Sequence, residues 1–252
     1  MKEHKLFITG NSQGLGHALS KAYLDLGWQV YGCSRQGCDI SQPALHDIRC
    51  DLSIFEQIPA TLDTLLTDIN ALDLVILNAG ILGKIQDLHK TPLADMQPVM
   101  DINLWANKVI LDYFHQRALP IKQIIAISSG AAVSGSRGWN AYALSKASLN
   151  MLMNLYAHEL PDTHLCAIAP GLIDSQMMDY LCVEPDPEQY PALQRIRAAR
   201  GTEVMPEPDD AAQRILRVVS TLRNYPSGSY VDIRQILAPE EYTQFQDGCR
   251  SS

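Results

Sequence analysis

A tyrosine, a lysine and a serine near the middle of the chain have the types and the spacing to transfer a proton. Tyr142 and Lys146 are four residues apart, so on a helix their side chains share one face, one turn apart. Ser129 lies thirteen residues before the tyrosine and shortly after the apolar run 124–127. Open α/β sheets place their ligands at the carboxyl ends of parallel strands, so the three side chains are predicted to meet at one site.

The chemistry of this trio depends on the phenol. Its ordinary pKa of about 10 makes it a poor acid or base at neutral pH, whereas an ammonium group beside it would stabilise the phenolate. The hydroxyl of Ser129 could hold a carbonyl oxygen against the phenol. The spacing of Tyr142 and Lys146 alone favours an ordinary amphipathic helix, so the catalytic interpretation depends on the elements around them.

The amino-terminal part of the chain has the pattern of a phosphate-binding turn. Residues 5–9 read as a buried strand and residues 17–26 show helical periodicity, with Gly10-Asn11-Ser12-Gln13-Gly14-Leu15-Gly16 between them. Such a turn holds a pyrophosphate against free backbone N–H groups and the positive end of the helix dipole. The spacing is Gly-x-x-x-Gly-x-Gly, which differs from the Gly-x-Gly-x-x-Gly of longer dehydrogenases. The pattern predicts a dinucleotide site.

The second strand, residues 29–33, ends in Ser34 and Arg35. Some dinucleotide folds carry an acidic residue at this point for the ribose 2′-hydroxyl, whereas an arginine suits a 2′-phosphate. The alternative is a solvated surface arginine. We therefore predict NADP(H) over NAD(H), and the positive charge of its oxidised nicotinamide would add to the stabilisation of the Tyr142 phenolate.

Strand-like and helical segments alternate through the rest of the chain. This alternation predicts a single α/β domain over residues 1–252, with a doubly wound, mostly parallel seven-stranded sheet and helices on both faces. The further strands are expected at residues 47–50, 73–77, 122–127, 164–169 and 228–233, and the further helices at 55–69, 98–119, 140–160 and 208–222.

Two connections stand out from this alternation. Residues 36–47 are polar, contain Gly37 and Pro43, and are too few for a full crossover helix before the next strand. Residues 175–207 are rich in methionine, proline and charge, and they follow a strand end, so we interpret them as an irregular lid over the site. Several residues suggest an apolar wall of the substrate pocket, and the alternative is that they only pack in the core. They are Trp139, Met177, Met178, Tyr180 and Leu181.

Composition limits the other possibilities. The net charge of −8 and the lack of a basic run argue against nucleic acid as a partner. No apolar stretch is long enough to cross a bilayer, and the first residues have no signal-peptide pattern. The six cysteines show neither Cys-x-x-Cys spacing nor a paired framework, so we expect reduced thiols and a cytoplasmic location. We predict no metal site.

Taken together, these motifs resemble the short-chain dehydrogenase/reductase family over essentially the whole chain. Any one motif is weak, but the set in this order and spacing is highly specific. The resemblance implies a Rossmann fold and a hydride transfer between nicotinamide and a small carbonyl or secondary alcohol. The motifs are Thr9-Gly10-x-x-x-Gly14-x-Gly16, Asn78-Ala79-Gly80, Asn103, Ser129, Tyr142-x-x-x-Lys146 and Pro170-Gly171.

The family implies a role for each catalytic position. Tyr142 would be the general acid/base and Ser129 would orient the substrate carbonyl. Lys146 would bind the nicotinamide ribose and lower the pKa of the tyrosine. Asn103 would hold the water that links Lys146 to bulk solvent in a proton relay.

The family also implies the residues that contact the coenzyme. Asn78-Ala79-Gly80 would support the sheet and the adenosine side, and Asp51 the adenine. The full predicted set is Gly10, Ser12, Gln13, Gly14, Leu15, Gly16, Ser34, Arg35, Asp51, Leu52, Asn78, Ala79, Gly80, Tyr142, Lys146, Pro170, Gly171, Ile173 and Ser175.

Within the family, residues 170–177 and the Val-Asp-x-Arg motif at 231–234 look most similar to the sepiapterin reductase and benzil reductase branch. Three features depart from the usual pattern. Gln13 stands where many NADP-dependent members carry a basic residue, Ser175 replaces a threonine, and the short link 36–47 replaces a full helix.

Two other functional classes fit the same sheet. A non-catalytic dinucleotide-binding regulator usually loses the tyrosine or the lysine, and this chain keeps all four catalytic positions. A lyase or epimerase tends to be longer, with a separate carboxyl-terminal substrate domain. Net carbonyl reduction or alcohol oxidation is therefore the favoured activity.

The helices expected at 98–119 and 140–160 carry more apolar surface than one sheet face can cover. In the family the equivalent helices pair across a two-fold axis into a four-helix bundle, so the resemblance implies a homodimer or a homotetramer. The residues spread around these helices are Trp105, Leu111, Tyr113, Leu149, Leu152 and Leu155.

Overall fold

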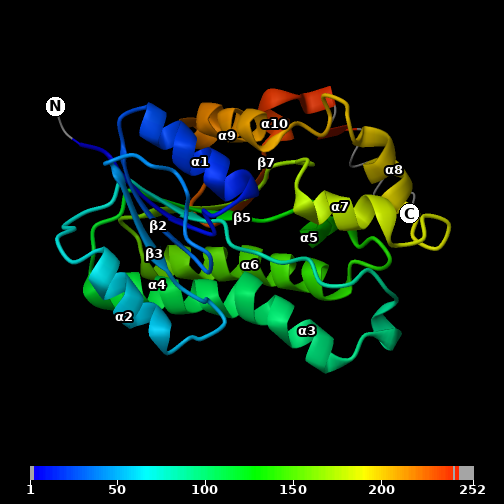
Figure 1. The fold of residues 1–252 in the computed structure, drawn as a ribbon, viewed down its shortest axis with the longest axis horizontal. Helices are drawn as coiled ribbons and strands as arrows, with labels where there is room; N and C mark the ends of the chain where they lie inside the picture. Colours follow the sequence, from blue (N-terminus) through cyan, green and yellow to red (C-terminus); the bar gives the residue numbers. More distant parts are fainter. Residues whose placement is uncertain (1–2, 241, 244–252) are drawn as a thin grey trace.

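A seven-stranded parallel sheet runs through the centre of the computed structural model, which describes residues 3–240, 242 and 243 (Figure 1). The strand order is β3-β2-β1-β4-β5-β6-β7, and every neighbouring pair is parallel. The chain winds outward in one direction from β1 to β3 and then in the other from β4 to β7. The strands are β1 Lys5–Thr9, β2 Gln29–Ser34, β3 Leu45–Arg49, β4 Leu74–Leu77, β5 Gln123–Ile127, β6 His164–Ala169 and β7 Ser229–Asp232.

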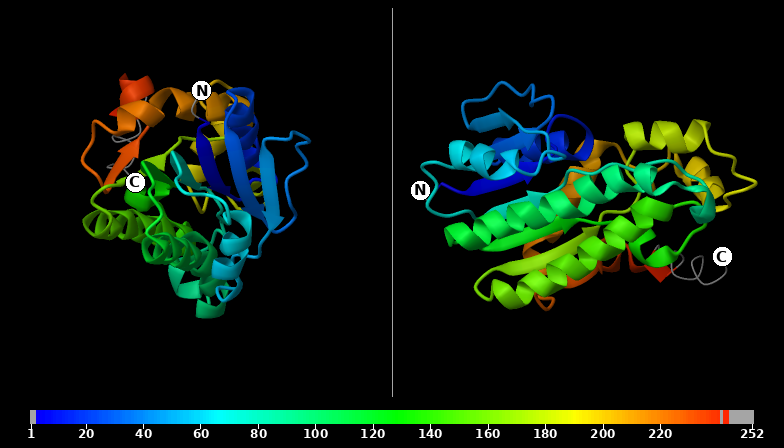
Figure 2. Two further views of the ribbon diagram at one scale, coloured as in Figure 1. Left: turned by 90° about the vertical axis from the view of Figure 1, so that its left-hand side faces the viewer. Right: turned by 90° about the horizontal axis from the view of Figure 1, so that it is seen from below.

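Helices cover both faces of the sheet, as predicted. In Figure 1, α1 (Gly14–Asp25) and α9 (Pro208–Leu222) lie above the sheet, and α2 (Gln57–Leu65), α4 (Ala106–Arg117) and α6 (Asn140–Glu159) lie below it. The end-on view in Figure 2 shows the sheet twisting between these two layers. Reversal of the winding between β1 and β4 creates a switch point at which open α/β sheets bind ligands.

Alternation along each strand divides the core between the two layers. On β1, Leu6 and Ile8 pack with the cluster under α1 and α9, whereas Phe7 packs with the cluster under α2, α4 and α6. Because both faces are covered, the inner strands are continuous apolar runs, and β4 and β5 are buried at every position. These runs are the reason that the strands were predictable from the sequence.

The segment predicted as one helix over residues 98–119 is divided into three parts. It comprises α3 (Leu93–Met100), a π-helical turn (Asp101–Trp105) and α4. The wider π turn inserts extra backbone where the fully buried Asn103 faces the loop after β4. Single-turn π segments occur often at functional sites, and an apolar period of 3.6 residues does not reveal them.

The six apolar residues expected around these helices are divided between core and surface. Leu111, Tyr113 and Leu149 are buried between helix and sheet, and Leu152 is half-buried. Trp105 and Leu155 are exposed, and so are Leu144 and Met151.

The two unusual connections differ in their structure. The described residues 35–44 contain no helix, as predicted. The segment 175–207 was expected to be irregular but contains two helices, α7 (Gln176–Val183) and α8 (Ala192–Ala199), which project at one end of the molecule in Figure 1. Short elements that the sequence did not predict are Leu88–Lys90, α5 (Ala131–Ser134) and α10 (Arg234–Leu237). None of the helices in the described part of the chain has both the length and the apolar character needed to cross a bilayer.

Candidate active site

A cavity of about 1110 Å³ opens at the carboxyl ends of the strands, beside the switch point. Its walls come from the loops after β1, β2, β3, β4, β5 and β6, so segments far apart in the sequence meet there. Every residue predicted to contact the coenzyme lines this cavity, and so does Ser129. Among the predicted catalytic residues, Asn103 alone lies behind the wall.

The glycine turn is packed so closely that Gly16 has no room for a side chain. A Cβ atom at Gly16 would lie 2.1 Å from the carbonyl oxygen of Gly10 and 2.5 Å from Nδ2 of Asn78. Helix α1 begins at Gly14, so its first backbone N–H groups lie at the cavity wall. Free N–H groups and the helix dipole at that point suit a pyrophosphate. The turn therefore fits the dinucleotide that its spacing predicts.

A set of hydrogen bonds ties the ends of β1 and β4 together beneath this turn. The Thr9 hydroxyl accepts the N–H groups of Asn78 and Ala79 at 3.0 and 3.1 Å. The Asn78 amide donates to the carbonyl oxygens of Thr9 and Gly10 at 3.0 and 3.1 Å. Asn78 thus supports the glycine turn from below and fixes the floor of the cavity.

Helix α6 and the end of β5 bring the predicted catalytic trio together. The Ser129 hydroxyl and the Tyr142 phenol lie on the same wall, and the serine acts on the phenol by lowering its pKa. Lys146 lies one turn along α6, with Nζ 5.8 Å from the centre of the Tyr142 ring. Its ammonium donates a hydrogen bond to the carbonyl oxygen of Ile127, at 2.7 Å. All three side chains reach the same cavity.

Burial controls the protonation of this trio. The Lys146 side chain is only 3% exposed, and burial lowers its pKa to about 8. Burial raises the pKa of the Tyr142 phenol, and the Ser129 hydroxyl opposes that shift only in part. The predicted lowering of the tyrosine pKa by Lys146 is therefore not seen in the protein alone. The phenol is a proton donor in this state.

Asn103 is placed to position other residues. Its amide oxygen accepts the N–H of Ile81 at 2.8 Å, and its Nδ2 donates to the carbonyl oxygen of Ile81 and to the Ser145 hydroxyl, both at 2.9 Å. A Cβ atom at Gly80 would lie 3.2 Å from Asn103 Oδ1 and 3.3 Å from Lys146 Nζ. Asn103, behind the cavity wall, and Lys146, on the wall, therefore both approach the same glycine.

The far end of the cavity is formed by the ends of β2 and β3. Ser34 is buried, and its hydroxyl oxygen accepts the N–H of Gly37 at 3.1 Å. Arg35 is exposed on the cavity wall. Asp51 accepts hydrogen bonds from the N–H and the hydroxyl of Ser53, and these bonds, with the nearby charge of Arg35, lower the pKa of its carboxyl group.

The opposite end of the cavity is apolar, and α7 supplies much of it. The five residues predicted as a substrate wall all line the cavity there. The Tyr180 hydroxyl accepts the N–H of Ile85 at 3.0 Å, which joins α7 to the loop after β4. Arg200 forms ion pairs with both Asp174 and Asp179 and so joins the two ends of this segment.

An ion pair beside the substrate end was not predicted. Arg137 binds both carboxylate oxygens of Asp87, at 2.6 and 2.9 Å, and this interaction holds the pKa of Asp87 at about 2. It fixes the loop between Ser129 and Tyr142 against the loop after β4. Fifty residues separate the partners, and no local spacing pattern relates them. The Val-Asp-x-Arg motif also forms an internal pair, between Asp232 and Arg234 beside Gly171.

The parallel sheet with its switch point, the glycine turn and the Ser129–Tyr142–Lys146 arrangement together define a dinucleotide-binding oxidoreductase. The chain belongs to the short-chain dehydrogenase family, since the family model described as short chain dehydrogenase matches residues 4–184. It is accordingly an NAD(P)-dependent dehydrogenase or reductase.

Three comparisons with individual proteins agree with this family. The chain is 28% identical over 241 residues to benzil reductase ((S)-benzoin forming) of Bacillus subtilis (strain 168), covering 91% of this chain and 98% of that protein. It is 28% identical to an NADPH-dependent pterin aldehyde reductase of Arabidopsis thaliana, covering 69% of this chain and 76% of that protein. These names confirm the predicted branch. A solved structure of 4-hydroxyisoleucine dehydrogenase complexed with NADH shares the fold, with a TM-score of 0.76, 23% identity and coverage of 91% and 96% of the two chains.

Proposed function

We propose that the protein catalyses the NADP(H)-dependent interconversion of a carbonyl compound and a secondary alcohol, with Tyr142 as the general acid/base. The observation that supports this best is the meeting of Ser129, Tyr142 and Lys146 at one cavity wall, with Lys146 one helical turn from the tyrosine. When bound, the reduced coenzyme supplies the hydride to the carbonyl carbon.

In the direction of reduction, Ser129 donates a hydrogen bond to the carbonyl oxygen and holds it against the phenol. Tyr142 transfers its proton to that oxygen as negative charge develops there, and becomes a phenolate. Lys146, with its ammonium charge, stabilises the phenolate and binds the nicotinamide ribose. A water held near Asn103 returns a proton to the site through Lys146. The alcohol oxidation reverses each transfer.

Different residues around the cavity would bind different parts of the dinucleotide. The N–H groups at the start of α1 would bind the pyrophosphate, and Asp51 the adenine, while Pro170, Gly171, Ile173 and Ser175 would line the nicotinamide side. Arg35 lies on the cavity wall and would meet a 2′-phosphate in a bidentate pair. This position supports NADP(H) over NAD(H), and the name of the Arabidopsis relative supports the same choice.

The apolar end of the cavity favours an apolar or aromatic carbonyl substrate. Trp139, Met178 and Leu181 are buried there, and the Bacillus relative is named for the reduction of an aromatic diketone. We propose that residues 175–207 act as a lid over this end, within a single domain that spans the chain. The contact between Tyr180 and Ile85 supports closure from that side.

The layer of α4 and α6 also supports self-association. Trp105, Leu144, Met151 and Leu155 are between 43% and 58% exposed, although each is a large apolar residue. Exposed apolar surface of this kind marks protein–protein interfaces. We propose that two copies pair through these helices into a homodimer, from which a tetramer can be built.

The proposed activity is tested by following the loss of NADPH absorbance against diketones, pterins, quinones, aldehydes and 3-oxoacyl thioesters. We expect turnover of at least one apolar ketone or diketone, with loss of turnover in Tyr142→Phe. Tight binding of NADPH without turnover of any compound in the set would contradict catalysis and favour a regulatory dinucleotide-binding protein.

A further inference from the structure

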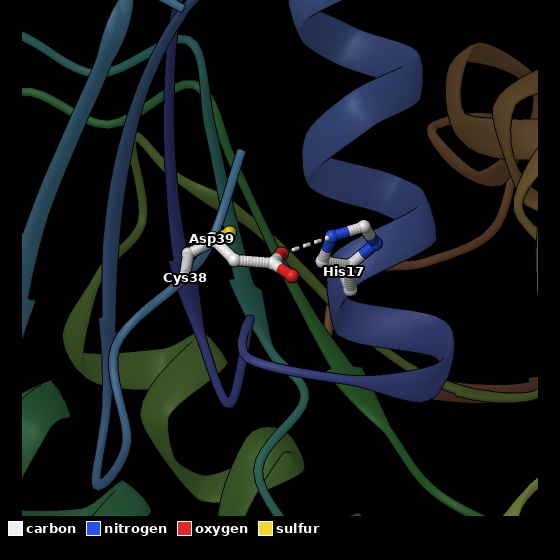
Figure 3. A group of neighbouring side chains, drawn as sticks. All are labelled: His17, Cys38 and Asp39. Carbon is white, nitrogen blue, oxygen red and sulfur yellow. Dashed lines mark hydrogen bonds and ion pairs between the residues drawn. The ribbon is translucent and has the colours of Figure 1, made fainter. Parts of the chain in front are cut away.

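Three side chains with metal-binding chemistry meet outside the coenzyme cavity, beside the short link between β2 and β3. His17 lies in the second turn of α1, and Cys38 and Asp39 lie in the link (Figure 3). Nε2 of His17 is 2.9 Å from Oδ1 of Asp39. The imidazole nitrogen, the thiol sulfur and the carboxylate oxygen all lie within 4.8 Å of one another.

We propose that His17, Cys38 and Asp39 bind a divalent transition-metal cation of the Zn²⁺ type, with water as a fourth ligand. Imidazole nitrogen, thiolate sulfur and carboxylate oxygen are the three donors that Zn²⁺ takes from proteins. The thiolate excludes Mg²⁺ and Ca²⁺, which prefer oxygen ligands. Two anionic ligands and a neutral imidazole balance the charge of the dication.

A metal ion would draw the sulfur, now within 4.8 Å of the other two atoms, closer to them and would move the imidazole and the carboxylate slightly apart. Tetrahedral Zn²⁺ with the usual bond lengths places nitrogen and oxygen donors about 3.3 Å apart, and sulfur and nitrogen about 3.6 Å apart. The His17–Asp39 separation would open by a few tenths of an ångström as the cation replaces the hydrogen bond. The Asp39 side chain is 88% exposed, so it is free to make this change.

Hydrogen bonds to Ser34 and Asp47 hold the link that carries two of the ligands. The N–H of Gly37 donates to the Ser34 hydroxyl at 3.1 Å, and the N–H of Cys38 donates to Oδ2 of Asp47 at 2.9 Å. The other oxygen of Asp47 accepts a hydrogen bond from Asn11 of the glycine turn at 2.7 Å. This support holds Cys38 in place beside α1 before any ion binds, which reduces the ordering that binding requires.

The surroundings of the Cys38 sulfur are negatively charged, which suits a cation. Asp39 lies beside it in the cluster, and the carboxylate of Asp47 accepts the backbone N–H of Cys38 at 2.9 Å. A cation bound by the thiolate would therefore be attracted by both carboxylates, and its binding would release the thiol proton.

The site gives the unusual link a structural role. A crossover helix would pack its own apolar face, but the described residues 35–44 contain no helix. A metal ion would fasten the link to α1 directly. Because the link begins next to Ser34 and Arg35, the same ion would also hold the coenzyme end of β2 in place.

Co²⁺ provides a direct test, because a cobalt–thiolate bond gives a charge-transfer absorption in the near ultraviolet. The full-length protein is treated with a chelator, exchanged into metal-free buffer and titrated with Co²⁺. We expect one equivalent to produce the charge-transfer band and Zn²⁺ to displace it. A hundredfold excess of Zn²⁺ over its dissociation constant should raise the unfolding midpoint by about 5–10 °C.

Matched variants decide whether these three residues form the site. Cys38→Ser should remove the band, and His17→Gln and Asp39→Asn should each weaken Co²⁺ binding at least tenfold, whereas Cys182→Ser, a partly exposed thiol on α7, should keep it. NADPH turnover and circular dichroism verify that each variant is folded. A wild-type protein that shows no band with excess Co²⁺, or a Cys38→Ser variant that keeps the wild-type band, would overturn the proposal.

Discussion

The ammonium group of Lys146 donates a hydrogen bond to the carbonyl oxygen of Ile127, 2.7 Å away at the carboxyl end of β5. Ser129 follows two residues after this carbonyl, and Tyr142 precedes Lys146 by one helical turn. One hydrogen bond therefore sets the position of α6 relative to the strand end that carries the serine. An ammonium has three N–H donors, so two remain for a ribose and a water.

The first prediction concerns the phenol. Tyr142→Phe keeps the packing of the ring but removes the proton donor, and general acid/base catalysis typically contributes about 10²–10⁴ in rate. We expect kcat to fall by that factor while the dissociation constant for NADPH, measured by fluorescence titration, changes little. A variant with kcat close to that of the wild type would remove Tyr142 from the proposed mechanism.

Local sequence signals account for much of this site. The glycine turn, Asn78-Ala79-Gly80 and the ends of the buried strands are short motifs whose neighbours in sequence are also neighbours in space. All of the coenzyme residues predicted from them line one cavity. The strands were predictable for the same reason, because a strand buried on both faces is a continuous apolar run.

The features that sequence reasoning missed depend on contacts between distant segments. The pair of Asp87 and Arg137 joins two loops fifty residues apart, and the π-helical turn at Asn103 is set by its hydrogen bonds to Ile81. Helical period could not show which apolar residues of the long helices face the sheet, so it did not separate the buried Leu111 and Leu149 from the exposed Trp105 and Leu155. Short helices such as α7 are stabilised by packing against the cavity wall more than by their own sequence.

The second prediction concerns pH. In the proposed mechanism the ammonium of Lys146 binds the coenzyme and stabilises the phenolate, and burial lowers its pKa to about 8 from 10.5. We expect kcat/KM for NADPH, which reports on the free enzyme, to fall as the pH rises through about 8.

The lowered pKa of Lys146 should also make the stability of the fold depend on pH, but stability should rise where kcat/KM falls. Between about pH 8 and 10.5 the unfolded chain binds the proton and the folded chain does not, so stability rises with pH.

The Lys146→Met variant distinguishes the pH effects of Lys146 from those of other titrating groups. The variant should have weak turnover and weak NADPH binding at every pH. Its unfolding midpoint, compared with that of the wild type across the same pH range, should lack the rise that Lys146 contributes. Identical pH dependence of stability in the two proteins would show that Lys146 is not the group with the lowered pKa.

The third prediction concerns assembly. Met151 is 58% exposed on α6, and a glutamate there would place a charge in the proposed dimer interface. We expect the wild type to sediment as a dimer or tetramer at micromolar concentration and Met151→Glu to shift it toward the monomer. Leu26→Glu is the control, since Leu26 is 61% exposed at the end of α1, on the opposite layer. A monomeric wild type, or equal effects of the two variants, would refute pairing through α6.

The last prediction concerns the choice of coenzyme. Arg35 lies on the cavity wall at the end of β2, where a 2′-phosphate would lie if the dinucleotide occupies this cavity. A hydrogen bond to a charged group contributes about 1.5–3 kcal/mol, which is roughly tenfold to a hundredfold in affinity. Arg35→Ala should therefore lower kcat/KM for NADPH by about that factor and leave the value for NADH nearly unchanged.

Arg49 supplies the control for charge alone. It is one strand away, opposite Ser34 in the pairing of β2 with β3, but it lines a separate hollow with Gly37 and Asp47. Arg49→Ala removes the same positive charge and should change the ratio of the two coenzymes much less than Arg35→Ala does. A wild type that prefers NADH, or an Arg35→Ala variant with an unchanged ratio, would make Arg35 a surface residue. An equal effect of the two variants would assign the preference to the general positive charge of this edge and not to a direct contact with the phosphate.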